Sequence, residues 1–302
     1  MRILYALALV ALVACSQPRY PMVRLHADLY SEVVAAERAP GRLPLRVAIA
    51  AVISPKATFD TYKPLLDYLA ERLDRPVELL QRLTYAEINE LIRTGQADLG
   101  FVCGGAFVEG EREGYMELLV VPQIGGLTTY QALVIVSASS PYVSLDELRG
   151  KRFAFTDPLS NSGHLYIQYR LALRNETPDS FFGDTIYTYS HDNAIRAVAQ
   201  GLVDGATIDS LVYDFLVVSE PELGRQLRVI ERSQPFGIPP VVVHPGLDPS
   251  LKALLRQALL EMSEDPKGRE ALAMLRADRF VPPDPAAYEG IRQMAALVRG
   301  WR

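Results

Sequence analysis

The stretch Arg152-Phe153-Ala154-Phe155-Thr156-Asp157-Pro158-Leu159-Ser160-Asn161-Ser162-Gly163-His164 joins a predicted strand, 152–156, to a predicted helix, 165–173. Small hydroxyl residues and a glycine at a helix start present backbone N–H groups without intrahelical partners, and the helix dipole adds partial positive charge. A phosphate-like anion fits such a site. The alternative is an ordinary N-cap, with Ser160 or Ser162 capping the helix.

Strand-like and helix-like segments alternate on both sides of this stretch. The predicted strands are 45–50, 77–80, 97–102, 117–122, 131–136, 152–156, 185–189, 206–208, 227–230 and 240–244. The predicted helices are 62–73, 85–93, 165–173, 192–201, 210–218, 249–262, 266–275 and 286–298, with a helical turn at 145–151. Such alternation is typical of α/β proteins, in which helices cover both faces of parallel sheets.

Two α/β units match each other in order. Residues 85–102 and residues 192–208 both run from a helix through Gly95 or Gly201 to a strand. Because more helices follow the second unit, we predict two lobes from a discontinuous chain: 45–135 plus 237–302 as lobe I, and 136–236 as lobe II. Ligands bind at the carboxyl ends of strands in such sheets. The candidate site residues that follow predicted strands are Ser54, 103–107, 160–163, His191 and Asp209.

The first 14 residues have the pattern of a lipoprotein signal peptide. Arg2 precedes an unbroken apolar run, 3–14. This run is shorter than the roughly 20 residues needed to span a bilayer, and it matches a signal-peptide h-region. The run ends in Leu12-Val13-Ala14-Cys15, so we predict cleavage and lipidation at Cys15, followed by a tether over 15–44. The alternative is a plain secretory peptide with a chance cysteine.

Composition excludes several classes of protein. The net charge of −5 argues against nucleic-acid binding, which requires a basic face. The chain has two cysteines. If Cys15 carries lipid, Cys103 has no partner for a disulfide and no cysteine zinc site can form. The 288 residues that remain after the signal peptide (302 minus 14) suffice for two domains.

Residues 45–300 resemble the phosphate/phosphite/phosphonate-type solute-binding proteins of ABC transporters. The segments that carry the resemblance are 148–151, 157–163, 190–192 and 201–209. The resemblance implies the type II periplasmic-binding-protein fold, an α/β fold with two lobes. Each lobe would be a mainly parallel sheet flanked by helices, with the ligand in the cleft between the lobes.

The resemblance also implies an anion-binding loop. Ser160, Asn161 and Ser162 would donate to the anion oxygens, together with backbone N–H groups near Gly163. Asn161 stands where the family has a threonine. His164 follows the loop and is expected to point away from the ligand.

Four further residues are expected around the ligand. His191 would donate through an imidazole nitrogen; a helix-cap or core histidine is the alternative. Asp209 would accept from a protonated anion oxygen or a ligand ammonium; the alternative is an N-cap. Tyr62 and Phe107 would form aromatic walls, unless they belong to the core. Phe107 stands where the family usually has a tyrosine, whereas two other tyrosines, Tyr85 and Tyr130, are interpreted as structural.

The function implied by the resemblance is transport. A lipid-anchored monomer on the periplasmic or extracellular face of a membrane would capture a small tetrahedral oxyanion (phosphonate, phosphite or phosphate). It would deliver the oxyanion to an ABC permease, without a cofactor, a metal or an enzymatic activity.

The sequence leaves three alternatives to transport: a sensory receptor, a hydrolase and a metal receptor. One is a sensory receptor of the same fold that acts on a membrane kinase or chemoreceptor. A hydrolase using Ser162, His191 and Asp209 lacks the Gly-x-Ser-x-Gly elbow. A metal receptor using His164, His191 and Asp209 lacks closely spaced ligands.

Overall fold

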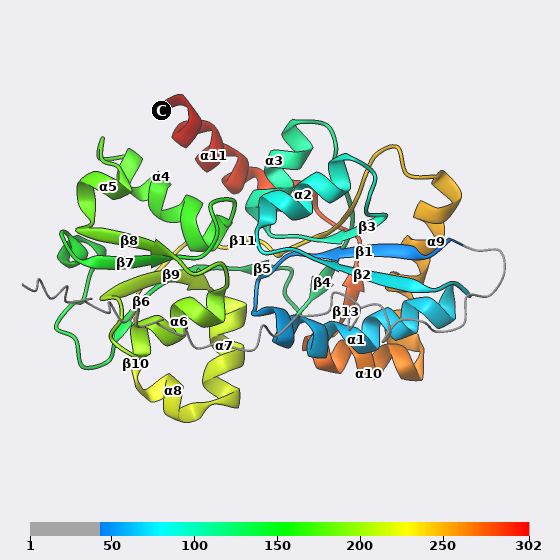
Figure 1. Cartoon of the computed structure of the whole chain (residues 1–302), viewed down its shortest axis with the longest axis horizontal. Coiled ribbons are helices and arrows are strands. Elements are labelled where there is room, and N and C mark those ends of the chain that lie inside the picture. Colours follow the sequence, from blue (N-terminus) through cyan, green and yellow to red (C-terminus); the bar gives the residue numbers. More distant parts are fainter. Residues whose placement is uncertain (1–42, 302) are drawn as a thin grey trace, which may run out of the picture. The chain divides into compact units, whose positions relative to one another are not determined.

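Two mixed sheets form the frame of the protein (Figure 1). The computed structural model describes residues 43–301, so the predicted signal peptide, Cys15 and nearly all of the predicted tether lie outside the described residues. The strand orders are β13-β4-β12-β3-β1-β2 and β10-β6-β9-β7-β8. Among the helices in this part of the chain, none has the length and apolar character needed to cross a membrane.

The six-stranded sheet belongs to the predicted lobe I. Its strands are β1 (Leu45–Ile49), β2 (Val77–Gln81), β3 (Leu99–Phe101), β4 (Glu117–Gln123), β12 (Val241–Val243) and β13 (Arg279–Val281). Strand pairing shows that β1 to β4 point one way, while β12 and β13 point the other way. Four of the six strands therefore share one direction, but the sheet is mixed and not mainly parallel as predicted, because the returning strand β12 is inserted between β3 and β4 and β13 pairs antiparallel with β4.

Helices cover both faces of this sheet. They are α1 (Pro55–Arg72), α2 (Tyr85–Arg93), α3 (Gly104–Arg112), α9 (Pro249–Leu260), α10 (Pro266–Leu275) and α11 (Glu289–Trp301). Side chains alternate along a strand, so Val47 of β1 packs with α1, α9 and α10, whereas Ala48 packs in the cluster that contains α2 and α3. Figure 1 shows α1 and α10 on one side of the sheet and α2 and α3 on the other.

The five-stranded sheet has the same plan. Its strands are β6 (Ala132–Ser137), β7 (Arg152–Phe155), β8 (Asp184–Tyr187), β9 (Gly205–Asp209) and β10 (Leu227–Arg232). All point one way except β6. The helices on its two faces are α4 (Tyr166–Ala172) and α5 (Pro178–Phe181) on one, and α6 (His191–Ala199), α7 (Ser210–Ser219) and α8 (Pro221–Arg225) on the other (Figure 1).

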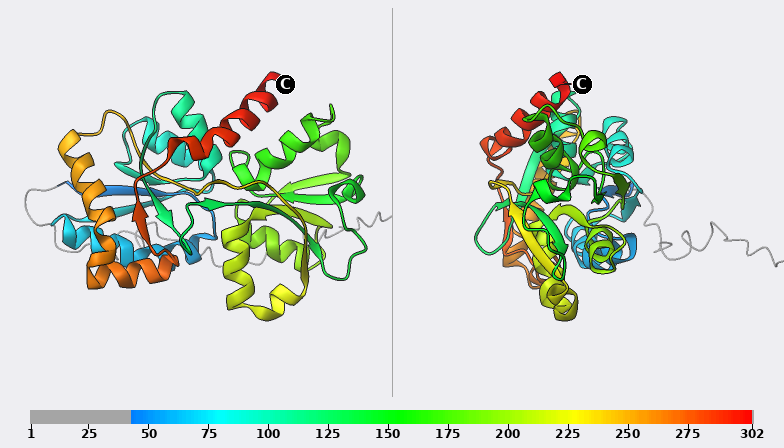
Figure 2. Two further views of the ribbon diagram at one scale, coloured as in Figure 1. Left: turned by 180° about the vertical axis from the view of Figure 1, so that it is seen from behind. Right: turned by 90° about the vertical axis from the view of Figure 1, so that its left-hand side faces the viewer.

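The chain passes between the sheets through a two-stranded ribbon. Strand β5 (Thr129–Tyr130) leads out of the first sheet and pairs antiparallel with β11 (Phe236–Gly237), which leads back (Figure 2). Strand β6 begins at Ala132, so the predicted lobe boundary after residue 135 falls inside a strand. The ribbon therefore offers a better position for the division than the predicted boundary.

Several helices differ from the sequence prediction, among them the short helices α5 and α8, which were not predicted. Helix α1 begins at Pro55, seven residues before the predicted start at 62, and continues through Pro64. Helix α3 was not predicted, because Gly104, Gly105 and Gly110 lower helix propensity. Tertiary packing explains these glycines, since a Cβ on each would lie within 3 Å of a neighbouring atom.

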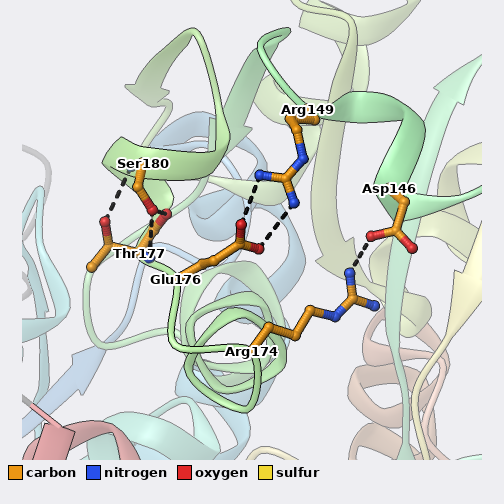
Figure 3. A network of polar contacts seen from close by, with 6 residues as sticks. All are labelled: Asp146, Arg149, Arg174, Glu176, Thr177 and Ser180. Carbon is orange, nitrogen blue, oxygen red and sulfur yellow. Dashed lines mark hydrogen bonds and ion pairs between the residues drawn. The ribbon is translucent and has the colours of Figure 1, made fainter.

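A polar network joins the segment around Arg149 to α5 (Figure 3). The Arg149 guanidinium binds both carboxylate oxygens of Glu176, at 2.7 and 3.0 Å, and stacks 4.3 Å from the Phe181 ring centre. Arg174 pairs with Asp146 in the same network. The contacts of Arg149, which belongs to the resemblance segment 148–151, therefore link this segment to α5 within the predicted lobe II.

Candidate functional site

The carboxyl ends of strands from both sheets meet at the candidate site. The hydrogen bonds that join the two sides there include Ser54 N–H to Asp192 Oδ1 (3.0 Å), Tyr85 N–H to Asp157 Oδ2 (3.0 Å), His191 N–H to Val52 O (3.0 Å) and Asn161 N–H to Cys103 Sγ (3.4 Å). Cys103 Sγ also lies 3.9 Å from Ser160 Oγ. The structure therefore brings the lobes into direct contact at the strand ends, where the sequence predicted the ligand.

The two serines of the 160–163 loop have different partners. Ser160 Oγ accepts the Gly163 N–H at 3.0 Å and caps a single π-helical turn, Asn161–Leu165, that leads into α4. Ser162 is fully buried, yet its hydroxyl makes no hydrogen bond. Its carbonyl accepts from Thr207 Oγ1 at 2.5 Å, which fixes the residue against β9. Ser160 is thus the N-cap, and Ser162 Oγ is free to bind a ligand.

Asn161 and Gly163 shape the same loop. Asn161 Nδ2 donates to the Tyr130 hydroxyl at 3.0 Å, and Asn161 Oδ1 is buried without a partner. A Cβ on Gly163 would lie 1.8 Å from Thr156 Oγ1, so only glycine fits at this turn.

His191 presents one ring nitrogen to the same region. Nδ1 accepts the Asp209 backbone N–H at 3.0 Å. The proton of the neutral ring is therefore on Nε2, which is buried and has no partner. Burial lowers the pKa of His191 to about 3, so the ring is neutral at physiological pH and offers a single N–H donor.

Buried polar atoms without partners concentrate around this loop. They are Tyr85 OH, Thr156 Oγ1, Asn161 Oδ1, Ser162 Oγ, Ser190 Oγ and His191 Nε2. Each such atom costs about 1–3 kcal/mol when it is left unsatisfied. A ligand that hydrogen-bonds to several of them would recover that cost. We define the anion cradle as Tyr85, Asn161, Ser162 and His191, together with Tyr130.

Tyr85 and Tyr130 belong to the cradle, whereas the sequence predicts a structural role for both. Burial raises the pKa of Tyr85 well above its usual value, and Cys103, Asp157, Asp209 and Tyr130 add to this shift. Burial also raises the pKa of Tyr130, whereas Asn161 and Ser162 act in the opposite direction. The Ser162 hydroxyl is thus close to Tyr130 without forming a hydrogen bond of normal geometry. No local sequence signal distinguishes these tyrosines from core residues.

Asp209 connects the cradle to helix α7. Its Oδ1 accepts the Leu211 N–H at 2.7 Å, so the carboxylate is the N-cap of α7. The side chain is almost fully buried, and burial raises its pKa to about 7. Asp209 also lies in the wall of a cavity of about 420 Å³. Asp209 is therefore the N-cap of α7, as the alternative interpretation predicted, and it also lies beside the cradle.

The remaining predicted residues lie in different surroundings. Tyr62 lines the cavity and packs edge-to-face on Phe101, with the two ring centres 5.2 Å apart. Phe107 is fully buried in the core of lobe I, where it packs edge-to-face on Tyr288 at 5.0 Å. His164 lies between Pro158 O (2.8 Å) and the Tyr187 hydroxyl (2.9 Å), so both ring nitrogens are engaged outside the cradle.

Comparison with known proteins identifies the family. The family described as ABC transporter, phosphonate, periplasmic substrate-binding protein matches residues 47–288. The chain belongs to this family. Its members are the substrate-binding components of ABC transporters and work outside the cytoplasm. The predicted family and the two-lobed type II fold are therefore confirmed.

Individual relatives agree with this assignment. The phosphonates-binding periplasmic protein of Escherichia coli is 26% identical over 239 residues, which cover 78% of this chain and 70% of that protein. The phosphate-import protein PhnD of Mycolicibacterium smegmatis is 27% identical over 254 residues, covering 78% and 79%. A phosphonate transporter binding protein of Pseudomonas aeruginosa has a TM-score of 0.80 at 25% identity, covering 86% of this chain and 88% of that one.

The candidate site contains no cluster of side chains suited to a metal ion among the residues that the structure describes. Within residues 43–301, no three His, Cys, Asp or Glu side chains are grouped in a way that could hold one. The cradle as defined consists of neutral hydroxyl, amide and imidazole groups. The hydroxyl groups and the imidazole N–H of the cradle can donate hydrogen bonds to an anion. Asn161 differs from the expectation that it donates to the ligand, because its Nδ2 already donates to Tyr130 and its unpartnered atom is the acceptor Oδ1, which can pair only with a protonated ligand oxygen.

The buried pair His191 and Asp209 predicts a pH dependence of stability. The pKa of His191 falls from 6.5 to about 3, so its contribution is present above pH 6.5 and is lost toward pH 3. The pKa of Asp209 rises from 3.8 to about 7, so its contribution is present below pH 3.8 and is lost as the pH rises through 7. Between pH 4 and 6.5 the two groups therefore change the free energy of unfolding in opposite directions as the pH rises, each by up to about 1.4 kcal/mol per pH unit.

Asp209→Asn removes one of the two titrating groups, so the pH dependence of stability that is due to His191 should become measurable. We expect the free energy of unfolding of the variant to rise with pH between 4.5 and 6.5 by about 1 kcal/mol per unit more than that of the wild type. Urea titrations at the two pH values measure this difference. Equal slopes for both proteins would show that Asp209 is ionised in this range.

Proposed function

We propose that this chain captures a small tetrahedral oxyanion (phosphonate, phosphite or phosphate) in the cradle and delivers it to an ABC permease. The observation that supports this proposal is the set of buried polar atoms without partners around Ser162 and His191. A tetrahedral oxyanion carries several acceptor oxygens in a compact volume. It could satisfy the hydroxyl of Ser162, the Nε2–H of His191 and the hydroxyl of Tyr85 together.

Asp209 supports a preference for a protonated anion. A carboxylate beside a dianion is repulsive, so Asp209 disfavours fully ionised ligands. Its pKa of about 7 is close to the range in which a phosphoryl oxygen loses its last proton, with a pKa near 6. One proton shared between Asp209 and the ligand would turn the repulsion into a hydrogen bond.

The contact between the lobes supports a closing motion. We place the hinge in the β5–β11 ribbon. Lobe I is then 45–135 plus 237–302 and lobe II is 136–236, except that the boundary near 135 moves to before Ala132, so that all of β6 belongs to lobe II. Such a hinge would let the lobes separate for ligand entry and exit. The hydrogen bonds from Tyr85 to Asp157 and from Ser54 to Asp192 would then be properties of the closed form.

The test of this function is a thermal-shift screen with phosphate, phosphite, methylphosphonate and sulfate. A ligand that binds only the native state at a hundred times its Kd stabilises the fold by about 2.7 kcal/mol. We expect a phosphorus oxyanion to raise the melting temperature by several degrees, and sulfate, which has no proton to share with Asp209, to have a smaller effect. If no oxyanion shifts the transition, the proposal fails.

A hydrolase is not supported by the geometry of the same residues. In a catalytic triad a carboxylate accepts a hydrogen bond from the histidine N–H. Here the Asp209 backbone N–H donates to His191 Nδ1, and the carboxylate instead accepts from Leu211. This geometry favours the proposed binding protein over a hydrolase that uses Ser162, His191 and Asp209.

We further propose that a lipid on Cys15 anchors a monomer to the periplasmic or extracellular face of a membrane. Replacing Cys15 with serine should move the protein from the membrane fraction to the soluble fraction, because acyl chains provide the anchor. Immunoblots of the two fractions measure the change, with Cys103→Ser as the matched control that keeps the anchor. Unchanged membrane association of the Cys15→Ser variant would refute the anchor.

A further inference from the structure

The C-terminal helix α11 packs on both lobes. By its place in the chain it belongs to lobe I, because it follows β13 and the short helical turn Pro285–Tyr288. It packs on α3 of lobe I, and also on α4 and the π-helical turn 161–165 of lobe II. Figures 1 and 2 show α11 running from α3 toward α4. The helix therefore crosses the boundary between the lobes and contacts the turn that contains Ser162.

One side of α11 is attached to lobe I. The Arg292 guanidinium binds both carboxylate oxygens of Glu111 of α3, at 2.7 and 2.8 Å. Such bidentate pairs fix geometry better than single contacts. Ile291 lies against the same helix, since a Cβ on Gly104 would be 2.8 Å from Ile291 Cδ1. We therefore expect α11 to move with lobe I when the lobes separate.

Another side of α11 faces lobe II. Arg292 and Arg299 lie on the side that pairs with glutamates of α3. An α-helix turns by about 100° per residue, so Met294 lies about 200° from Arg292 and about 140° from Arg299. Met294 is nevertheless only 2% exposed. Because it points away from α3, the elements that bury it are α4 and the 161–165 turn of lobe II.

We propose that α11 is a strap between the lobes: it is fixed on lobe I, and its Met294 side holds the 161–165 turn and α4 in the ligand-binding position. The inference rests on the proposed function, since the ligand must bind between the lobes. Opening at the β5–β11 ribbon would carry α4 and the turn away from α11 and expose Met294 to water. Burial of this apolar side chain therefore favours the closed form, and Met294 acts as a positioning residue for the turn.

The test is to compare Met294→Ala with Ile291→Ala in the full-length protein, using methylphosphonate and phosphate as probes. Complete burial of a methionine corresponds to about one to two decades in an equilibrium constant. We expect Met294→Ala to weaken binding about tenfold, mainly through faster dissociation. Ile291→Ala is the matched control, because it removes a buried side chain from the α3 side of the same helix. It should lower the melting temperature and leave the affinity unchanged.

Calorimetry, stopped-flow kinetics and thermal melting of the three proteins give these quantities. Wild-type affinity in Met294→Ala, or equal losses of affinity in both variants, would overturn the inference and leave the proposed function intact. If the wild type binds neither probe, both are refuted. If thermal melting shows that Met294→Ala is unfolded, Met294→Val replaces it, with the same direction of change expected.

Discussion

Replacing Gly105 with alanine is expected to weaken binding of the preferred oxyanion about tenfold to a hundredfold. A Cβ at this position would lie 2.3 Å from the carbonyl oxygen of Leu159 and 2.9 Å from the backbone nitrogen of Asn161. Gly105 belongs to α3 of lobe I, while both contacted atoms are backbone atoms of lobe II, so no side chain can rotate to relieve the overlap. Overpacking of this kind costs about 1–3 kcal/mol, which corresponds to about one to two decades in Kd.

Two measurements separate a block of closure from a loss of folding. Calorimetry gives the affinity, and solution scattering gives the radius of gyration, which should fall on ligand addition in the wild type and stay unchanged in Gly105→Ala. Gly110→Ala is the control on the same helix, because its Cβ would meet Met116 and Tyr115 within lobe I. That control should lose stability but still close. Wild-type affinity and compaction in Gly105→Ala would show that the contact seen here is not needed for binding.

Ser162→Ala is expected to weaken oxyanion binding about tenfold to a hundredfold without destabilising the empty protein. A hydrogen bond to a charged group contributes about 1.5–3 kcal/mol, and each 1.4 kcal/mol is a decade in Kd. The Ser162 hydroxyl is buried and has no partner in this structure. Removing it therefore breaks no hydrogen bond in the empty protein and eliminates an unsatisfied polar group.

Ser160→Ala is the matched control for this prediction. Its hydroxyl caps the turn through Gly163, so its loss should cost about 0.5–2 kcal/mol of unfolding free energy and have the smaller effect on affinity. Calorimetry and urea unfolding of both variants measure the two effects. The assignment of Ser162 as a ligand donor fails if its alanine variant binds the oxyanion as tightly as the wild type.

The sequence by itself determined the family and the two-lobed α/β plan, and it indicated the edge of the sheets at which we propose the site. The period of the apolar positions defines elements such as α2 and α10 within one or two residues. In a sheet of parallel strands, polar residues that directly follow strands must gather at one edge. This rule predicts from the sequence alone that Ser162, His191 and Asp209 lie near one another.

Only the tertiary structure decided what each of these side chains does. Ser160 and Ser162 are equivalent in sequence terms, and their roles separate only because Ser160 Oγ lies on the Gly163 N–H. His191 is a neutral Nε2–H donor because the Asp209 backbone occupies its other nitrogen.

The same limit applies to the aromatic residues. Tyr85 reaches the cradle while Phe107 packs on Tyr288, although both are buried aromatic side chains on helices. The contacts that make these distinctions join residues far apart in the chain, such as Tyr85 with Asp157, 72 positions away. Local propensity and periodicity carry no information about such pairs, because the pairs form only when the strand ends of two separate sheets are brought together.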